Sequence, residues 1–261
     1  MSMPLLSIQD LHVRYGGIAA LRGIHLTVHA GETVMVTGPN GAGKSTLMKT
    51  IAGLVRPRQG KVIFNGQLTS GHAPETVAAS GFSLVPEGRQ VFGSMTVLEN
   101  LRIGTGMRRN PMAVAADLEY LLDVFPLLRE RSNSQAGLLS GGQQQMLVIA
   151  RALMAAPRLL AIDEPSLGLA PRVTDQVYEA LLRLRAERDL TLLIVEQSAS
   201  RALLTGGRMV MLREGGIVLE GDPRQISPER MQQAYFGYDT PPDAGARESA
   251  HAQNAAAPLP A

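Results

Sequence analysis

The chain has 261 residues, of which 45% are hydrophobic and 18% charged, a length and composition that predict a folded protein with a sizeable core in one or two domains. It contains no cysteine, which excludes disulfides, iron–sulfur clusters, thiolate zinc sites and cysteine nucleophiles. It has no tryptophan and only 5 phenylalanine and 5 tyrosine residues, which argues against a base-stacking surface for nucleic acid, whereas 25 basic against 23 acidic residues give little guidance.

Short apolar runs alternate with helical patterns along the chain, which predicts an α/β fold with buried, largely parallel strands. The expected strands are, in chain order, residues 33–37, 81–85, 159–162, 190–195, 208–212 and 217–219. Residues 213–216, Arg-Glu-Gly-Gly, separate the last two strands and are typical of a hairpin. Before these, apolar residues on one face predict an amphipathic helix over residues 172–188. They are Val173, Val177, Ala180, Leu181 and Leu184.

A more polar segment, residues 94–138, interrupts this pattern. It contains helical stretches such as residues 113–124, so we expect a helical subdomain, about residues 94–157, inserted in the α/β core. At its start, Phe92, Met95 and Val97 are either core residues or a docking surface. Beyond Tyr238, residues 239–261 are rich in Ala and Pro without apolar periodicity, and we predict that this tail is disordered.

The segment from Gly38 to Ser45 has the spacing GxxxxGK[ST] and follows the expected strand 33–37. In such a loop, backbone N–H groups face one anion, and the following helix adds its positive N-terminal end. Lys44 is predicted to reach the β- and γ-phosphates of a nucleotide, and the Ser45 hydroxyl to bind Mg²⁺. A Gly-rich turn that begins a helix is the simpler alternative. The residues expected to bind the nucleotide are Gly38, Pro39, Asn40, Gly41, Ala42, Gly43, Lys44, Ser45 and Thr46.

An apolar strand, residues 159–162, ends in two carboxylates, Asp163 and Glu164. Ligands of parallel sheets bind at the carboxyl ends of strands, where these acids lie. Asp163 suits Mg²⁺, because hard cations prefer oxygen ligands. Glu164 can act as a general base on an attacking water. Two solvated acids at a strand end are the alternative interpretation.

Residues 139–143 read Leu-Ser-Gly-Gly-Gln. Ser140 and Gln143 have the spacing of a capping box, which predicts that a helix begins here. Ser140, Gly141 and Gly142 also offer small, donor-rich groups to an anion at that helix N-terminus. One nucleotide does not need two such sites from one chain, so each site makes sense if it serves the phosphate of the opposite subunit.

With the phosphate loop, LSGGQ and LLAIDEP in this order, residues 5–238 resemble the ATP-binding cassette (ABC) family. The resemblance implies a P-loop NTPase fold of the α/β class, with a RecA-like parallel-sheet core, an antiparallel β subdomain and the helical subdomain. It also implies that residues 1–238 form the ATPase domain, with ATP and Mg²⁺ as ligands.

The resemblance further implies a head-to-tail dimer with two ATP molecules at its interface. Each ATP is then held by the Lys44 loop of one subunit and by Ser140, Gly141, Gly142 and Gln143 of the other. Tyr15, which precedes Gly16-Gly17, occupies the position whose ring stacks on adenine. A surface aromatic residue beside a turn is the alternative for Tyr15.

Three positions depart from the general family pattern. Glu87, in Val-Pro-Glu-Gly-Arg, stands where most members have a Gln, and we assign it to the magnesium site. Gln197, in Val-Glu-Gln, stands where a switch His is usual; its amide can still donate to the γ-phosphate but cannot become cationic. Ala170 stands where Asp is expected. No His lies nearby to replace the switch, since His251 is the only His after Asp163.

The segments VPEGRQVF, EPSLGLAP and VEQ are similar to the second ATPase subunit of high-affinity branched-chain amino-acid importers, the LivF type. The resemblance implies an ATP-hydrolysing subunit that powers uptake, with Glu164 and Gln197 as catalytic residues. It implies permease subunits, a second related cassette and, indirectly, a solute-binding protein as partners, and no nucleic acid. The second cassette implies a heterodimer, although the isolated chain can also form a homodimer.

The N-terminus lacks the pattern of a secretory signal, and no apolar run is long enough to span a membrane. We therefore expect a cytoplasmic protein, peripheral on the inner face of the cytoplasmic membrane. Three alternatives remain open. The importer can carry other amino acids, urea, amides or small carboxylates; the chain can be a cassette ATPase that acts on nucleic acid or ribosomes; or it can be a regulatory module that does not hydrolyse ATP.

Overall fold

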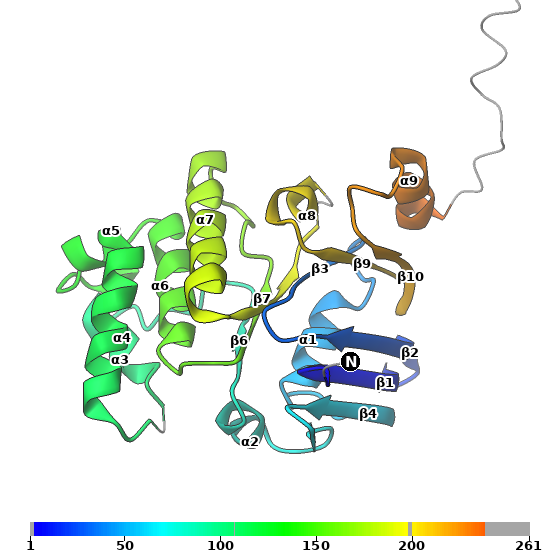
Figure 1. Ribbon diagram of the computed structural model, residues 1–261, viewed down its shortest axis with the longest axis horizontal. Helices are drawn as coiled ribbons and strands as arrows, with labels where there is room; N and C mark the ends of the chain where they lie inside the picture. Colours follow the sequence, from blue (N-terminus) through cyan, green and yellow to red (C-terminus); the bar gives the residue numbers. More distant parts are fainter. Residues whose placement is uncertain (1–2, 107, 198–199, 238–261) are drawn as a thin grey trace, which may run out of the picture.

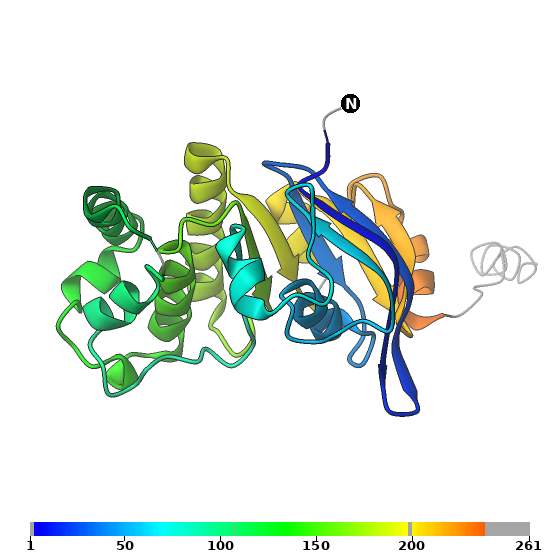
Figure 2. The same cartoon turned by 90° about the horizontal axis from the view of Figure 1, so that it is seen from below.

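The computed structural model describes residues 3–106, 108–197 and 200–237. Its strands form two sheets, one of six strands and one of four. Figures 1 and 2 place both sheets toward one end of the molecule and a group of helices at the other. The predicted tail, residues 239–261, lies outside the described residues.

The six-stranded sheet has the order β10-β9-β3-β8-β7-β6. Its strands are β3 Thr33–Thr37, β6 Phe82–Val85, β7 Leu159–Asp163, β8 Thr191–Val195, β9 Arg208–Arg213 and β10 Gly216–Gly221. All neighbours are parallel except β9 and β10, which form the predicted hairpin. Each predicted strand is therefore confirmed, with ends that differ by no more than two residues.

The four-stranded sheet is antiparallel and has the order β2-β1-β4-β5. Its strands are β1 Leu6–Tyr15, β2 Ile18–Val28, β4 Gln59–Phe64 and β5 Gln67–Leu68. Buried side chains recur at every second residue of β1 except at a bulge between Ile8 and Leu11, as expected for a sheet with one buried face and an interrupted register. The residue patterns located none of these four strands, although the family resemblance implied an antiparallel subdomain.

Helices surround the larger sheet. They are α1 Lys44–Ile51, α2 Pro74–Ala79, α3 Val97–Ile103, α4 Pro111–Val124, α5 Pro126–Glu130, α6 Gly141–Leu153, α7 Pro171–Arg188, α8 Ser200–Thr205 and α9 Pro228–Phe236, with a short 3₁₀ helix at Ala136–Leu138. Helices α3 to α6 lie together, and α7 lies between them and the sheet (Figure 1). The helices expected over 113–124 and 172–188 correspond to α4 and α7.

The larger sheet is buried on both faces, and its strands divide their side chains between two hydrophobic clusters. Leu160 of β7 packs with the helices α3 to α7, whereas Leu159 and Ala161 pack with α1 and the antiparallel sheet. This alternation follows from the two-residue period of a strand. Because both faces are covered, the open edge at the carboxyl ends of the strands is where polar groups can meet a ligand.

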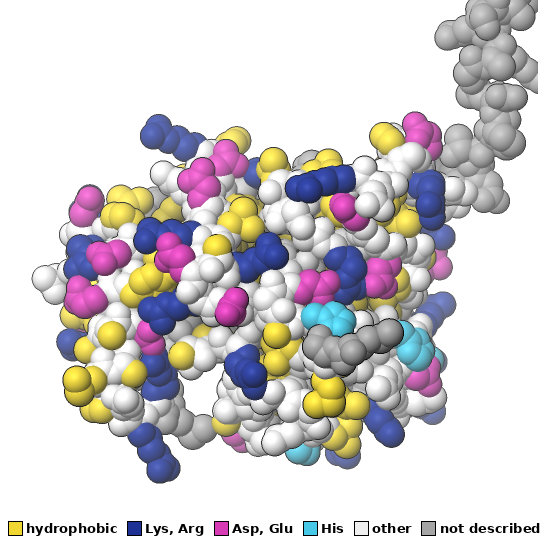
Figure 3. Space-filling model, in the orientation of Figure 1, with side chains coloured by type: hydrophobic (Ala, Val, Ile, Leu, Met, Phe, Trp, Pro, Cys, Tyr) yellow, Lys and Arg dark blue, Asp and Glu magenta, His cyan; other side chains and the backbone are white. Residues whose placement is uncertain are grey.

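The segment at the start of the helical region, for which the sequence left open a core or a docking role, contains both buried and exposed apolar residues. Val97 is fully buried and belongs to the core, whereas Phe92 and Met95 are 48% and 37% exposed. On the face shown in Figure 3, acidic and basic side chains are interspersed. None of the described helices is long and apolar enough to cross a membrane.

Candidate active site

The loop after β3 turns back sharply and leads into α1, which begins at Lys44. Two of its positions require glycine. A Cβ on Gly38 would lie 2.1 Å from the carbonyl oxygen of Leu212, and one on Gly43, where φ is +104°, would lie 2.6 Å from that of Ala20. The absence of a side chain at these points allows the loop to pack against its neighbours while the N-terminus of α1 faces the site.

Lys44 is folded against its own loop. Its Nζ donates hydrogen bonds to the carbonyl oxygens of Gly38 at 2.7 Å and Pro39 at 3.1 Å. Burial lowers the pKa of Lys44, and the nearby carboxylates of Glu164 and Asp163 oppose that shift. The ammonium group is therefore close to both acids, in a place where an anionic ligand can replace the two carbonyl contacts.

A cavity of about 420 Å³ opens above this loop. It is lined by Tyr15, Ala20, Asn40, Gly41, Ala42, Gly43, Lys44, Ser45, Thr46, Glu87, Glu164, Leu167 and Gln197. The structure thus brings together residues from β1, the phosphate loop and the ends of three parallel strands. Tyr15 ends β1 and is 49% exposed, which leaves its ring accessible at the edge of the cavity.

Asp163 is the last residue of β7 and does not itself line the cavity, although its neighbours Glu164 and Ser45 do. It is 4% exposed, and its Oδ1 has no hydrogen-bond partner among the described residues. Burial raises the pKa of Asp163, as do the carboxylates of Glu164 and Glu87, while a hydrogen bond from Ser45 acts in the opposite direction. A buried acceptor without a partner, near a hydroxyl and two acids, fits a divalent cation.

No group of three or more His, Asp or Glu side chains within the described part of the chain forms a complete metal site. The donors near Asp163 are too few to hold a cation alone. A cation bound here therefore needs further oxygen ligands from water or from the phosphates of a nucleotide, which is the usual arrangement for Mg²⁺.

Glu164 directly follows β7 and has a left-handed backbone, with φ of +52°. Its N–H donates to the carbonyl of Val195 at 3.0 Å, which ties it to the end of β8. Its Oε2 accepts a hydrogen bond of 2.9 Å from Nε2 of Gln197. The acid and the amide therefore lie side by side, facing the cavity that contains Lys44.

The LSGGQ segment begins α6 as predicted. The Ser140 hydroxyl accepts from the N–H of Gln143, and Oε1 of Gln143 accepts from the N–H of Ser140, which confirms the capping box. None of Ser140, Gly141, Gly142 and Gln143 lines the cavity above the phosphate loop. Within one chain, the two predicted phosphate sites are separate.

The sequence alone assigned no role to two residues near the site, Glu196 and Arg89. Glu196 is a buried carboxylate bonded to Ser166, and Arg89 donates to the carbonyl of Gly168 at 3.3 Å, with its guanidinium against Gly141. Both lie within motifs that the sequence analysis quoted. Because their contacts join segments that are distant in sequence, local sequence patterns do not predict either role.

Comparison with known proteins places this site in a family. The model of the ABC transporter family matches residues 21–167, which include the phosphate loop, LSGGQ and the acidic pair. High-affinity branched-chain amino acid transport ATP-binding protein BraG of Pseudomonas aeruginosa is 39% identical, over 89% of this chain and 100% of the relative. The probable branched-chain amino acid transport ATP-binding protein LivF of Archaeoglobus fulgidus is 33% identical, over 85% and 94%. The high-affinity branched-chain amino acid transport ATP-binding protein LivG of Escherichia coli is 31% identical, over 91% of this chain and 99% of the relative.

Solved structures have the same fold. The ADP conformation of an ATP-binding cassette of an ABC transporter is 28% identical, with a TM-score of 0.78 over 91% of this chain and all of that chain. A dimeric cassette in a post-hydrolysis state, bound to ADP and Pi, is 25% identical, with a TM-score of 0.73 over 85% and 100%. The predicted fold class is confirmed, and this chain belongs to the ABC transporter family.

Proposed function

We propose that this chain is the ATP-binding and ATP-hydrolysing subunit of an importer for branched-chain amino acids. The observation that carries the proposal is a single cavity lined by the phosphate loop, Glu164 and Gln197. The relatives named above support it, since each is described as a branched-chain amino acid transport ATP-binding protein.

The phosphate loop binds the nucleotide. Backbone N–H groups of residues 38–46 and the N-terminus of α1 receive the phosphates, because both present positive ends to the cavity. Lys44 exchanges its contacts with the Gly38 and Pro39 carbonyls for the β- and γ-phosphates. The exposed ring of Tyr15, at the edge of the same cavity, stacks on adenine.

Asp163, Ser45 and Glu87 hold the Mg²⁺ that accompanies ATP, directly or through water. When bound, the cation neutralises charge on the phosphate oxygens. The buried Oδ1 of Asp163 supports this assignment, because a cation would satisfy an acceptor that has no partner in the described residues. Glu87 supplies a carboxylate where most family members have an amide.

Glu164 serves as the general base that takes a proton from the attacking water. The Gln197 amide orients the Glu164 carboxylate through the 2.9 Å hydrogen bond and can donate its second N–H to the γ-phosphate. Since an amide does not titrate at physiological pH, Gln197 stays a neutral donor throughout the cycle. Hydrolysis therefore depends on Glu164 for proton transfer.

Two subunits complete the site. ATP-binding subunits of ABC importers dimerise and work with membrane permeases, and a relative has been solved as a dimer bound to ADP and Pi. We infer that Ser140, Gly141, Gly142 and Gln143 of one cassette bind the ATP on the phosphate loop of the other. Their separation from the cavity of their own chain supports this arrangement. A second, related cassette is the proposed partner, and we propose that binding to the permease subunits holds the complex on the inner face of the cytoplasmic membrane.

The experiment is uptake of radiolabelled leucine by cells or proteoliposomes that contain this chain with its permease subunits and partner cassette. We expect uptake with the wild-type chain and none with Lys44→Ala. Competition with valine, isoleucine, urea and small amides identifies the solute class. Uptake of urea rather than leucine would contradict the solute assignment. Leucine uptake that persists with the Lys44→Ala variant would contradict the proposal that ATP binding by this chain powers transport.

A further inference from the structure

Glu196 is a buried acid that the proposed hydrolysis does not use directly. It follows β8, precedes Gln197 and is 3% exposed. It forms no ion pair with any described residue. Hydrogen bonds must therefore replace the hydration that this carboxylate loses on burial.

Three hydrogen bonds do so, and they come from two elements. In the loop that joins β7 to α7, the Ser166 hydroxyl donates to Oε2 at 2.8 Å and the Ser166 N–H donates to Oε1 at 3.2 Å. On α7, the Tyr178 hydroxyl donates to Oε1 at 2.7 Å. Burial raises the pKa of Tyr178, and the nearby charge of Glu196 raises it further. The phenol therefore keeps its proton and remains a hydrogen-bond donor.

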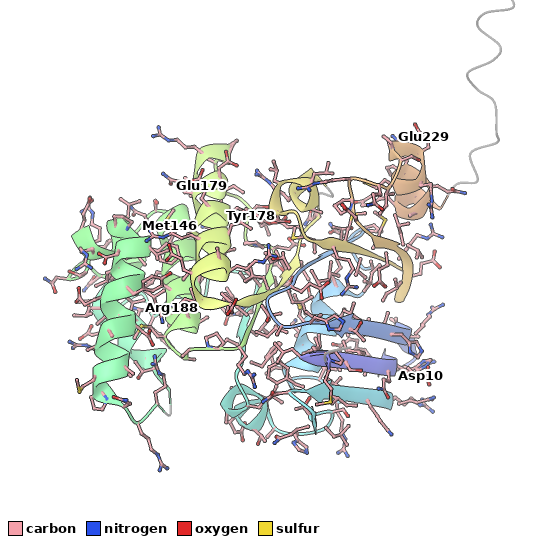
Figure 4. The ribbon with its side chains drawn as sticks, in the orientation of Figure 1. Asp10, Met146, Tyr178, Glu179, Arg188 and Glu229 are labelled. Carbon is pink, nitrogen blue, oxygen red and sulfur yellow. The ribbon has the colours of Figure 1, made fainter. Side chains whose placement is uncertain are left out.

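Tyr178 is itself held in place. It is 5% exposed and lies on the part of α7 that is next to α8 (Figure 4). The guanidinium of Arg201, on α8, lies 5.7 Å from the centre of its ring and forms an ion pair of 2.9 Å with Asp175. The groups around Glu196 therefore belong to packed elements and not to a free surface.

Two side-chain links join the same pair of segments, in addition to the backbone bond from the Glu164 N–H to the Val195 carbonyl. Gln197 binds Glu164, and the residue before Gln197 binds the residue two positions after Glu164. Leu167, next to Ser166, lines the cavity above the phosphate loop. Any shift of the end of β8 relative to the β7–α7 loop must therefore change both the Gln197–Glu164 contact and the wall of the cavity.

We propose that Glu196 is a positioning residue for hydrolysis, a role that rests on the proposed ATPase function. By binding Ser166 and Tyr178, it fixes the end of β8 against the β7–α7 loop and keeps the Gln197 amide beside the Glu164 carboxylate. The need arises because Gln197 is neutral. A neutral amide is attracted to a carboxylate less strongly than a cation is, so its position depends more on the backbone that presents it.

A double-mutant cycle tests this role. Glu196→Gln keeps the size of the side chain but replaces one acceptor oxygen by a donor that faces Ser166 or Tyr178. We expect kcat to fall about tenfold, with KM for MgATP and the Kd of a fluorescent ATP analogue within about twofold of wild type. In a Gln197→Ala background, the same change should alter kcat less than about twofold, because Glu196 acts through Gln197. Equal losses in the two backgrounds, or a rise of KM and Kd with the loss of kcat, would overturn the proposal.

A matched pair of tyrosine variants provides a second route that does not depend on the folding of Glu196→Gln. Tyr178→Phe removes one buried donor to Glu196, whereas Tyr120→Phe removes a tyrosine–glutamate bond of similar length, 2.6 Å, that is exposed and joins α4 to Glu187 of α7. We expect Tyr178→Phe to lower kcat several-fold at constant KM, again only when Gln197 is present, and Tyr120→Phe to leave kcat unchanged. Equal effects of the two variants would contradict the positioning role.

The same assays separate this role from the proposed function. Wild-type turnover no higher than that of Lys44→Ala would contradict the ATPase assignment and, with it, the role of Glu196. Clear wild-type turnover with an additive cycle would contradict the positioning role alone.

Discussion

Gln197 donates a hydrogen bond of 2.9 Å from Nε2 to Oε2 of Glu164. The two residues follow neighbouring parallel strands, β7 and β8, which pair in register through Asp163 and Val195. Strand pairing therefore delivers the acid and the amide to the same point at the edge of the phosphate-loop cavity. A neutral amide at this position makes the site independent of the ionisation that a His would introduce.

Gln197→His should restore a titrating group to this position. A histidine has an ordinary pKa of about 6.5, so its charge would change within the working range. We expect the pH profile of kcat for MgATP hydrolysis to gain an inflection near pH 6.5, which the wild-type profile lacks. Steady-state rates between pH 5.5 and 8.5, with Gln197→Ala as the control, provide the measurement. An unchanged profile in the His variant would contradict direct participation of this side chain.

Gly141 and Gly142 should respond differently to alanine. A Cβ on Gly142 would lie 2.3 Å from Cγ1 of Val173 on α7, whereas one on Gly141 would meet only the end of the Arg89 side chain, which can move. Gly142→Ala should therefore lower the free energy of unfolding by about 1–3 kcal/mol through overpacking. Gly141→Ala should leave it within about 1 kcal/mol of wild type.

Urea denaturation of the isolated chain measures these differences. Val173→Ala added to Gly142→Ala should recover part of the loss, since it removes the methyl group that the new Cβ meets. Gly141→Ala, although folded, should lose ATP-dependent dimerisation, because Gly141 is proposed to bind the partner's ATP. A folded Gly141→Ala variant that dimerises normally would contradict this role.

Asp163→Asn should stabilise the nucleotide-free protein at neutral pH. Burial raises the pKa of Asp163 above its ordinary value of 3.8. Such a group favours the folded state below its unfolded-state pKa and loses that contribution as the pH rises through the folded-state pKa. At pH 7.5 the charged form is therefore unfavourable, and its removal should raise Tm by about 2–4 °C for each 1 kcal/mol gained.

Thermal melts in EDTA at pH 7.5 and pH 4.5 check the sign, since the advantage of Asn should shrink at the lower pH. The same variant should lose the additional rise in Tm that MgATP gives to the wild type, because Asp163 is a proposed ligand of the cation. A less stable Asn variant at pH 7.5 would contradict the interpretation of the unpaired Oδ1.

Ala170→Asp should stabilise α7. Ala170 is the N-cap residue and makes no side-chain cap, although Pro171 removes one unpaired N–H at the first position of the helix. An Asp at this exposed position can accept from the free N–H groups and interact with the helix dipole, which is worth about 0.5–2 kcal/mol. Urea denaturation measures the gain, with Ala170→Leu, which cannot cap, as the control. Equal stability of the two variants would contradict the capping argument.

The residues of the larger sheet and of the phosphate loop were predictable because local pattern and final environment agree. Strands 33–37 and 159–162 are short apolar runs buried on both faces, and the loop from Gly38 has a spacing with a direct physical meaning. Strands β1 and β2 were not located, because their alternation is broken by bulges, with register shifts between Ile8 and Leu11 and again before Arg14.

Most of the residues that line the cavity were predicted from the sequence, but the contacts between them were not. Glu164 and Gln197 were assigned to one reaction, yet the hydrogen bond between them depends on which strands are neighbours. Glu196 and Ser166, 30 residues apart, meet for the same reason. The environments of Met95 and Val97 were also not predictable. Both are apolar, yet Met95 is partly exposed and Val97 lies in the core, because the packing of the helices and not the residue type decides which side chain is buried.

Steady-state hydrolysis of MgATP by the purified chain, beside Lys44→Ala and Glu164→Gln, tests the central claim most directly. We predict measurable wild-type turnover, loss of ATP binding in Lys44→Ala, and a fall in kcat of at least about 100-fold in Glu164→Gln while ATP still binds. Turnover of Glu164→Gln close to that of wild type would contradict the assignment of Glu164 as the general base, and with it the chemistry derived from this cavity.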